Sequence, residues 1–154
     1  MMTQLYFAYG SNLSTEQMNW RCKFNELVGP AYLEGYKLDF TFKSPAWGGG
    51  CADIVKKEGG VVWGLLYRIT DEGLKALDRY EGHPTAYRRF ETSVRLKDGT
   101  EKRSVWTYEV VKKKACLPTK EYLGIILDAA NWHDFPKSYR DEIQEIWDKI
   151  SSRV

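Results

Sequence analysis

The chain has 154 residues, a length that favours one domain spanning residues 1–154 over two. Lysine and arginine number 23 against 21 aspartate and glutamate residues, so the formal net charge is only +2. This balance argues against a basic nucleic-acid-binding domain and against a polybasic membrane anchor. No stretch of the sequence approaches the ~20 apolar residues that a transmembrane helix needs.

The cysteines and histidines do not form a recognisable metal site. Cys22, Cys51 and Cys116 lie far apart, and the two histidines are His83 and His133. Because no zinc-ligand spacing is present, we expect reduced thiols and no structural metal site. The N-terminus lacks the basic region and long apolar run of a signal peptide, which favours a cytoplasmic location.

The first third of the chain contains two strand patterns and one helix signal. Leu5–Tyr9 is a short apolar run that stops at a glycine, which is typical of a buried strand. Ser14 followed by Gln17 forms a capping-box pattern and predicts a short helix. Tyr36–Phe42 alternates apolar and polar residues, as a half-buried strand does.

The middle of the chain predicts a loop, two strands and a capped helix. Pro45 and the glycines up to Gly50 indicate the loop, and Cys51–Val55 and Val61–Ile69 are strand patterns. A turn at Glu58–Gly60 is expected to separate these two strands. Thr70 can cap the helix that follows, which should end before Gly82.

The last third predicts a hairpin and two helices. Arg88–Leu96 and Lys102–Val110 are strand patterns joined across Asp98-Gly99, a strong hairpin signal. Thr119 opens a helix to about residue 130, and an apolar stripe predicts a final helix over about Ser138–Ile150.

Together these patterns predict about six strands and three or four short helices. Their order is neither a strict strand–helix alternation nor a run of strands alone. The fold class is therefore α+β: a small mixed, largely antiparallel β-barrel with flanking short helices. Lys112–Lys114 is interpreted as a solvated loop, with phosphate binding as the alternative.

Tyr9–Asn12 is the first candidate site, between the first strand and a capped helix. Gly10 would let the backbone turn with positive φ and approach a ligand closely. Successive backbone N–H groups in such a turn can bind a carboxylate or an oxyanion. An ordinary strand-to-helix turn is the alternative.

Glu81 is the second candidate, because it falls at the C-terminal end of the predicted middle helix. The negative end of the helix dipole and partial burial should both raise the pKa of its carboxyl group. A general base needs a pKa nearer neutrality than that of an ordinary glutamate. A solvated loop glutamate is the alternative. Asp78 is interpreted as a surface carboxylate and Glu72 as a helix-start carboxylate.

Tyr122 is the third candidate. If Thr119 caps its helix, Tyr122 lies in the first turn. Its phenol could then hydrogen-bond a ligand in a cleft, or it could simply pack in the core.

Several ordered segments resemble the γ-glutamyl cyclotransferase family, also described as AIG2-like or BtrG-like. They are Tyr6–Leu13 with its YGSN signature, Gly35–Phe40, Gly50–Ile54, Val62–Tyr67, Leu77–Gly82 and Pro118–Tyr122, the last with threonine where the family has serine. The resemblance spans about residues 5–145, and its specificity comes from the ordered set rather than from one motif.

The resemblance implies conversion of a γ-glutamyl amide to 5-oxoproline and a free amine, without a cofactor. It implies Glu81 as the catalytic residue. The substrate-binding residues that it implies are Tyr6, Phe7, Ala8, Tyr9, Gly10, Ser11, Asn12 and Tyr122. The expected partner is a small γ-glutamyl substrate rather than a nucleic acid or a membrane, and a homodimer is left open.

Two other functions are carried as alternatives: a non-catalytic small-molecule binding protein on the same fold, and a small RNA-binding barrel. The leaving group is also open between an amino acid, a lysine-type or other amine, and an acyl-antibiotic intermediate. Glutathione is less expected, because the resemblance is to the branch that acts on dipeptides.

Overall fold

The computed structural model describes residues 2–152, within which five strands, four α-helices and one 3-10 helix follow one another. In chain order they are β1 (Thr3–Ala8), η1 (Ser11–Leu13), α1 (Thr15–Arg21), β2 (Asn25–Ser44), β3 (Gly49–Thr70), α2 (Asp71–Glu81), β4 (Tyr87–Leu96), β5 (Glu101–Val110), α3 (Lys120–Trp132) and α4 (Lys137–Ser151).

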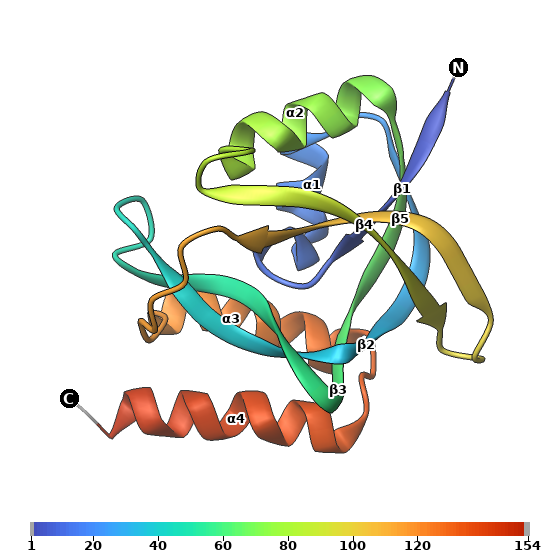
Figure 1. Ribbon diagram of the computed structural model, residues 1–154. Coiled ribbons are helices and arrows are strands. Elements are labelled where there is room, and N and C mark those ends of the chain that lie inside the picture. The colour runs from blue at the N-terminus through green and yellow to red at the C-terminus, as the bar shows by residue number, and fades with distance from the viewer. Residues whose placement is uncertain (1, 153–154) are drawn as a thin grey trace.

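The strands form a closed barrel in the order β1-β3-β2-β4-β5. All neighbours pair antiparallel except β1 and β5, which close the barrel as a parallel pair. Figure 1 shows α3 and α4 side by side at one end, with α1 and α2 at the other. The prediction of an α+β fold with a small, largely antiparallel mixed barrel is confirmed.

The helix starts follow the local capping signals. The side-chain oxygens of Ser14, Thr70 and Thr119 accept hydrogen bonds from the backbone N–H three residues later. Each cap satisfies one of the amide groups that the first turn of a helix leaves without a partner. No helix among residues 2–152 has the length and apolar character to cross a bilayer.

The predicted turn at Glu58–Gly60 is wrong, because β3 continues through it. Glu34 of β2 pairs with Val61, whereas Tyr36 pairs with Lys56. Between these two pairs β3 has more residues than β2. The additional β3 residues form a bulge within one strand, not a turn between two strands. A glycine in the bulge has φ of 76°, which explains why the sequence looks like a turn.

Lys112–Lys114 is an exposed loop after β5, as predicted, but Lys113 also makes ion pairs with the barrel. Its Nζ atom lies 2.8 Å from Oδ2 of Asp53, whose carboxylate is fully buried, and 3.2 Å from Oε1 of Glu109. The backbone N–H of Val110 donates to the other oxygen of Asp53. The partly exposed ammonium of Lys113 therefore pairs with a carboxylate that is buried in the barrel.

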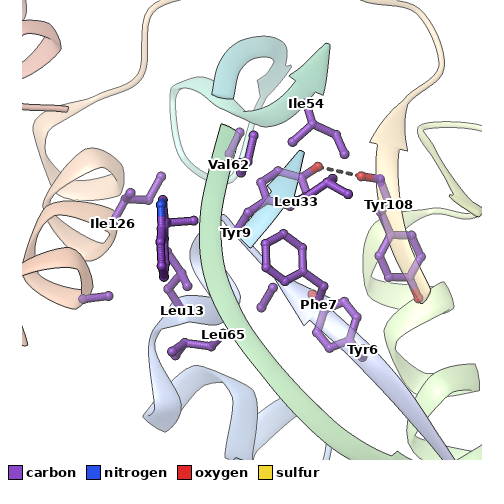
Figure 2. Packing of buried hydrophobic residues seen from close by; sticks show 14 of the residues in the cluster. Tyr6, Phe7, Tyr9, Leu13, Leu33, Ile54, Val62, Leu65, Tyr108 and Ile126 are labelled. Carbon is purple, nitrogen blue, oxygen red and sulfur yellow. Dashed lines mark hydrogen bonds between the residues drawn. The ribbon is translucent and has the colours of Figure 1, made fainter. Parts of the chain in front are cut away.

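β1 ends at the centre of the aromatic core. The hydroxyl of Tyr9 donates to the main-chain carbonyl of Tyr108 at 2.7 Å, as Figure 2 shows. The ring of Tyr6 packs edge-on against that of Tyr108, with 5.9 Å between the ring centroids. These contacts fix the segment after β1 against β5, where the barrel opens into a cavity.

Candidate active site

A cavity of about 390 Å³ lies where β1, η1, the ends of α1 and α2, the β2–β3 hairpin and the first turn of α3 meet. Its lining includes seven of the nine predicted site residues: Tyr6, Tyr9, Gly10, Ser11, Asn12, Glu81 and Tyr122. The structure therefore brings together three segments that are far apart in the sequence.

Phe7 and Ala8 do not line the cavity. Both side chains are buried in the core, and the main-chain carbonyl of Phe7 accepts a hydrogen bond from the hydroxyl of Thr107 at 2.9 Å. The two residues hold the barrel together directly before the cavity begins.

The predicted positive φ at Gly10 is wrong, because its φ is −114° and its ψ is −131°. Glycine is required for a different reason. A Cβ atom at this position would lie 3.0 Å from both the Cβ atom of Ala52 and the hydroxyl oxygen of Tyr122. Gly10 is thus needed because two residues of the cavity wall lie too close to its backbone for a side chain to fit.

Gly10→Val is therefore expected to distort the cavity. Overpacking of this kind costs about 1–3 kcal/mol, whereas a displacement of about 1 Å in a catalytic site can lower the rate roughly 10²-fold. We expect kcat/KM to fall by more than the loss of folded protein explains, when steady-state kinetics are compared with thermal unfolding of the same variant. Gly124→Val is the control, since a Cβ there would meet only Trp147, at 3.8 Å. Loss of activity only in proportion to unfolding would indicate a purely structural turn.

Glu81 is the last residue of α2, and the partly buried carboxyl group faces the cavity. Gly82 follows in the left-handed conformation with φ of 67° and ends the helix. Burial raises the pKa of Glu81 from 4.5 to about 7, and the positive charge of Arg21 opposes this rise. The predicted direction of the pKa shift is confirmed, and desolvation is its leading cause.

Tyr122 lies in the first turn of α3, as predicted, with its ring buried against the cavity. Its hydroxyl oxygen accepts a hydrogen bond from the backbone N–H of Ala52 at 2.9 Å. The ring also packs edge-on against Trp47, with 5.1 Å between centroids. Because this hydroxyl already accepts a bond from the protein, its own proton is available for a molecule in the cavity.

Asp78 is not the surface carboxylate that the sequence suggests. Its Oδ1 atom accepts hydrogen bonds from the hydroxyl of Tyr108 at 2.7 Å and from Nε of Arg89 at 2.9 Å. Since Tyr108 lines the cavity, Asp78 supports one of its walls from behind. Glu72, by contrast, is exposed at the helix start, as predicted.

Four other cavity residues carry no recognisable signal in the sequence: Arg21, Trp47, Tyr87 and Tyr108. Tyr87 donates to the carbonyl of Ala52 at 2.7 Å, so tyrosines hold both sides of that residue. These side chains come from four different elements or loops, and no local pattern connects them. A tyrosine at the start or end of a strand is equally typical of a core residue.

The thiols and acidic groups do not suggest a metal centre. The three cysteines are free, and burial raises the pKa of Cys51, which lines the cavity, to about 11. Among residues 2–152, no group of three or more histidine, cysteine, aspartate and glutamate side chains is placed to hold a metal ion. Glu81 is thus the cavity's acidic group with a pKa near neutrality.

The chain is similar to several known proteins over most of its length. A family model described as "Gamma-glutamyl cyclotransferase, AIG2-like" matches residues 6–134. A γ-glutamylcyclotransferase of Homo sapiens is 32% identical over 147 residues, which cover 92% of this chain and 78% of that protein. Its Bos taurus counterpart is 31% identical with the same coverage. A solved γ-glutamyl cyclotransferase structure matches with a TM-score of 0.87 and 29% identity, covering 98% of this chain and 99% of the other.

Proposed function

The chain belongs to the AIG2-like γ-glutamyl cyclotransferase family, and we propose that Glu81 is the residue that moves protons in its reaction. The family relationship confirms the resemblance seen in the sequence. The reaction converts a γ-glutamyl amide to 5-oxoproline and a free amine. The observation that carries the proposal is the position of Glu81. Its carboxyl group, with a pKa of about 7, faces the cavity where the three predicted site segments meet.

The chemistry needs a group that first accepts a proton and then donates it. The substrate's α-amino nitrogen attacks its own γ-carbonyl carbon, and the amide bond to the leaving amine breaks. The attacking nitrogen must lose a proton and the leaving nitrogen must gain one. A carboxyl group with a pKa near 7 can be an effective base and then an effective acid at neutral pH.

The rest of the cavity would hold the substrate in a folded conformation. We propose that Tyr9–Asn12 and the hydroxyl of Tyr122 hold the α-carboxylate or the developing oxyanion of the γ-glutamyl group. Preorganised donors in a site shielded from water are effective because they need not reorient during the reaction. Because the attack is intramolecular, fixing the substrate's conformation lowers the barrier directly.

The family relationship and the ionisation of Glu81 favour catalysis over the alternative of a non-catalytic binding protein. The near-neutral net charge supports neither a nucleic-acid nor a polybasic membrane partner. A cytoplasmic location is part of the proposal. The sequence leaves a homodimer open, and size-exclusion chromatography with light scattering tests the oligomeric state.

A substrate panel tests the proposed function. The protein would be incubated with γ-glutamyl amino acids, γ-glutamyl amines and a γ-glutamyl acyl-antibiotic intermediate. The 5-oxoproline formed would be measured by mass spectrometry. We expect stoichiometric 5-oxoproline and free amine from at least one class, and none from the matching α-glutamyl compounds. Release of free glutamate instead of 5-oxoproline would show hydrolysis and contradict the proposal.

A further inference from the structure

We infer that Arg21 is a positioning residue for this reaction: its guanidinium holds the Ser11–Asn12 segment in place and supplies a positive charge to the cavity that contains Glu81. The inference rests on the proposed role of Glu81. It adds a residue from α1 that no sequence motif of the site includes.

One side of Arg21 holds the segment that follows β1. Its Nη1 atom donates to Oδ1 of Asn12 at 3.0 Å and approaches the hydroxyl of Ser11 at 3.4 Å. The side-chain amide of Asn12, which is only 3% exposed, donates in turn to the hydroxyl of Tyr6 at 2.9 Å. A continuous chain of hydrogen bonds thus joins the end of α1 to the floor of the cavity.

The other side of Arg21 contacts the end of α2. The guanidinium carbon lies 5.1 Å from the centroid of the Tyr80 ring, a cation–π distance. Tyr80 directly precedes Glu81, and its ring also packs against Trp20, with 5.8 Å between the centroids. One side chain therefore connects the predicted substrate loop with the helix end that presents the carboxyl group.

The charge of Arg21 acts on Glu81 without a direct ion pair between the two among the described residues. Arg21 lowers the pKa of Glu81, against the larger effect of burial. The other titratable side chains of the cavity are Tyr6, Tyr9, Cys51, Arg79, Tyr80, Tyr87, Tyr108 and Tyr122. Burial raises the pKa of Tyr6, Cys51, Tyr87, Tyr108 and Tyr122 above 10, so these groups are neutral at pH 7.

Two variants separate the hydrogen bonds of Arg21 to the Ser11–Asn12 segment from the effect of its charge. Arg21→Gln removes the charge. Arg21→Lys keeps the charge but lacks the planar guanidinium that donates to Asn12 and Ser11 through Nη1 while it lies over the Tyr80 ring. Arg79→Gln is the matched control for the charge: it removes a cation from the same lining that is not among the causes of the Glu81 pKa shift.

Two measurements are made on each protein: NMR titration of the Glu81 carboxyl group without substrate, and the pH dependence of kcat/KM for 5-oxoproline formation. We expect Arg21→Gln to raise the pKa of Glu81 and to move the acid limb upward equally. Arg21→Lys should leave the limb near its wild-type position yet lower kcat/KM at its plateau by up to roughly 10²-fold, because the loop is no longer held. Arg79→Gln should leave the pKa of Glu81 unchanged.

The outcomes that overturn the inference are specific. An unchanged Glu81 pKa in Arg21→Gln would show that the charge of Arg21 does not act on Glu81. Full activity in Arg21→Lys would show that the guanidinium is not needed to hold the Ser11–Asn12 segment. A raised KM with unchanged kcat and an unmoved acid limb would show that Arg21 binds substrate directly. The titration needs no turnover, so it still decides the charge effect if wild-type protein forms no 5-oxoproline and the proposed function fails.

Discussion

Glu81→Gln is expected to lower kcat for 5-oxoproline formation by roughly 10²–10⁴-fold, the contribution of a well-placed general acid/base. The amide has nearly the same size as the carboxyl group and keeps its place in the cavity. It cannot accept the proton of the attacking amine, and it cannot return that proton to the leaving nitrogen. The loss should appear in kcat as well as in kcat/KM, because proton transfer occurs in the transition state.

The control for this variant is Glu72→Gln in the same helix. Glu72 is 85% exposed, and its only ion pair among residues 2–152 is with Lys75 at 3.7 Å. We expect it to keep nearly full activity in the 5-oxoproline assay. A Glu81→Gln protein that retains more than about a tenth of the wild-type rate would exclude the proposed role of Glu81.

The same Glu81→Gln variant is expected to be more stable than the wild type at pH 8. A carboxyl group with a pKa of about 7 in the folded state and 4.5 when unperturbed binds its proton more tightly in the folded protein. Its stabilising contribution is complete below pH 4.5 and is lost as the pH rises through 7. Each pH unit of this interval corresponds to about 1.4 kcal/mol, so the gain at pH 8 is at most about 3.5 kcal/mol.

Urea unfolding of both proteins at pH 4.5, 6 and 8 measures this gain. The difference in the free energy of unfolding should be smallest at pH 4.5 and should reach its plateau above pH 7. A Glu81→Gln protein that is less stable at pH 8 would indicate that the carboxylate is well solvated or paired in the folded state. Together, lost activity and raised stability would mark Glu81 as a residue kept for function.

The sequence predicts those parts of the fold that depend on neighbours along the chain. The caps at Ser14, Thr70 and Thr119 need only an oxygen and an amide three residues later, so their pattern is visible locally. The hairpin at Asp98-Gly99 has the same local character, and Gly99 has φ of 91°.

The wrong predictions concern residues whose partners are far away in the chain. A glycine-rich turn and a glycine-rich bulge look alike until the pairing with β2 is known, as Glu58–Gly60 shows. Asp78 looks like a surface residue because Tyr108, whose hydroxyl donates to it, comes from another element. Gly10 illustrates the same limit, since Ala52 and Tyr122 define its space.

The candidate site could be predicted only in part for the same reason. Glu81 carries a local signal, because a carboxylate at a helix C-terminus is electrostatically unfavourable. Arg21, Tyr87 and Tyr108 carry none, and only the closed barrel brings them to the same cavity. The family resemblance supplies the ordered motifs, whereas the contacts between them come from the fold.

The most direct test of the central claim is a titration of the Glu81 carboxyl carbon by NMR, compared with the acid limb of kcat/KM for the same protein. Glu81→Asp and Glu81→Gln samples assign the signal and separate it from the titration of the substrate. We expect both the carboxyl group and the acid limb to titrate at about pH 7. A Glu81 pKa at or below 4.5, with an acid limb elsewhere, would contradict the claim that ionisation of this partly buried carboxyl group controls the cyclisation.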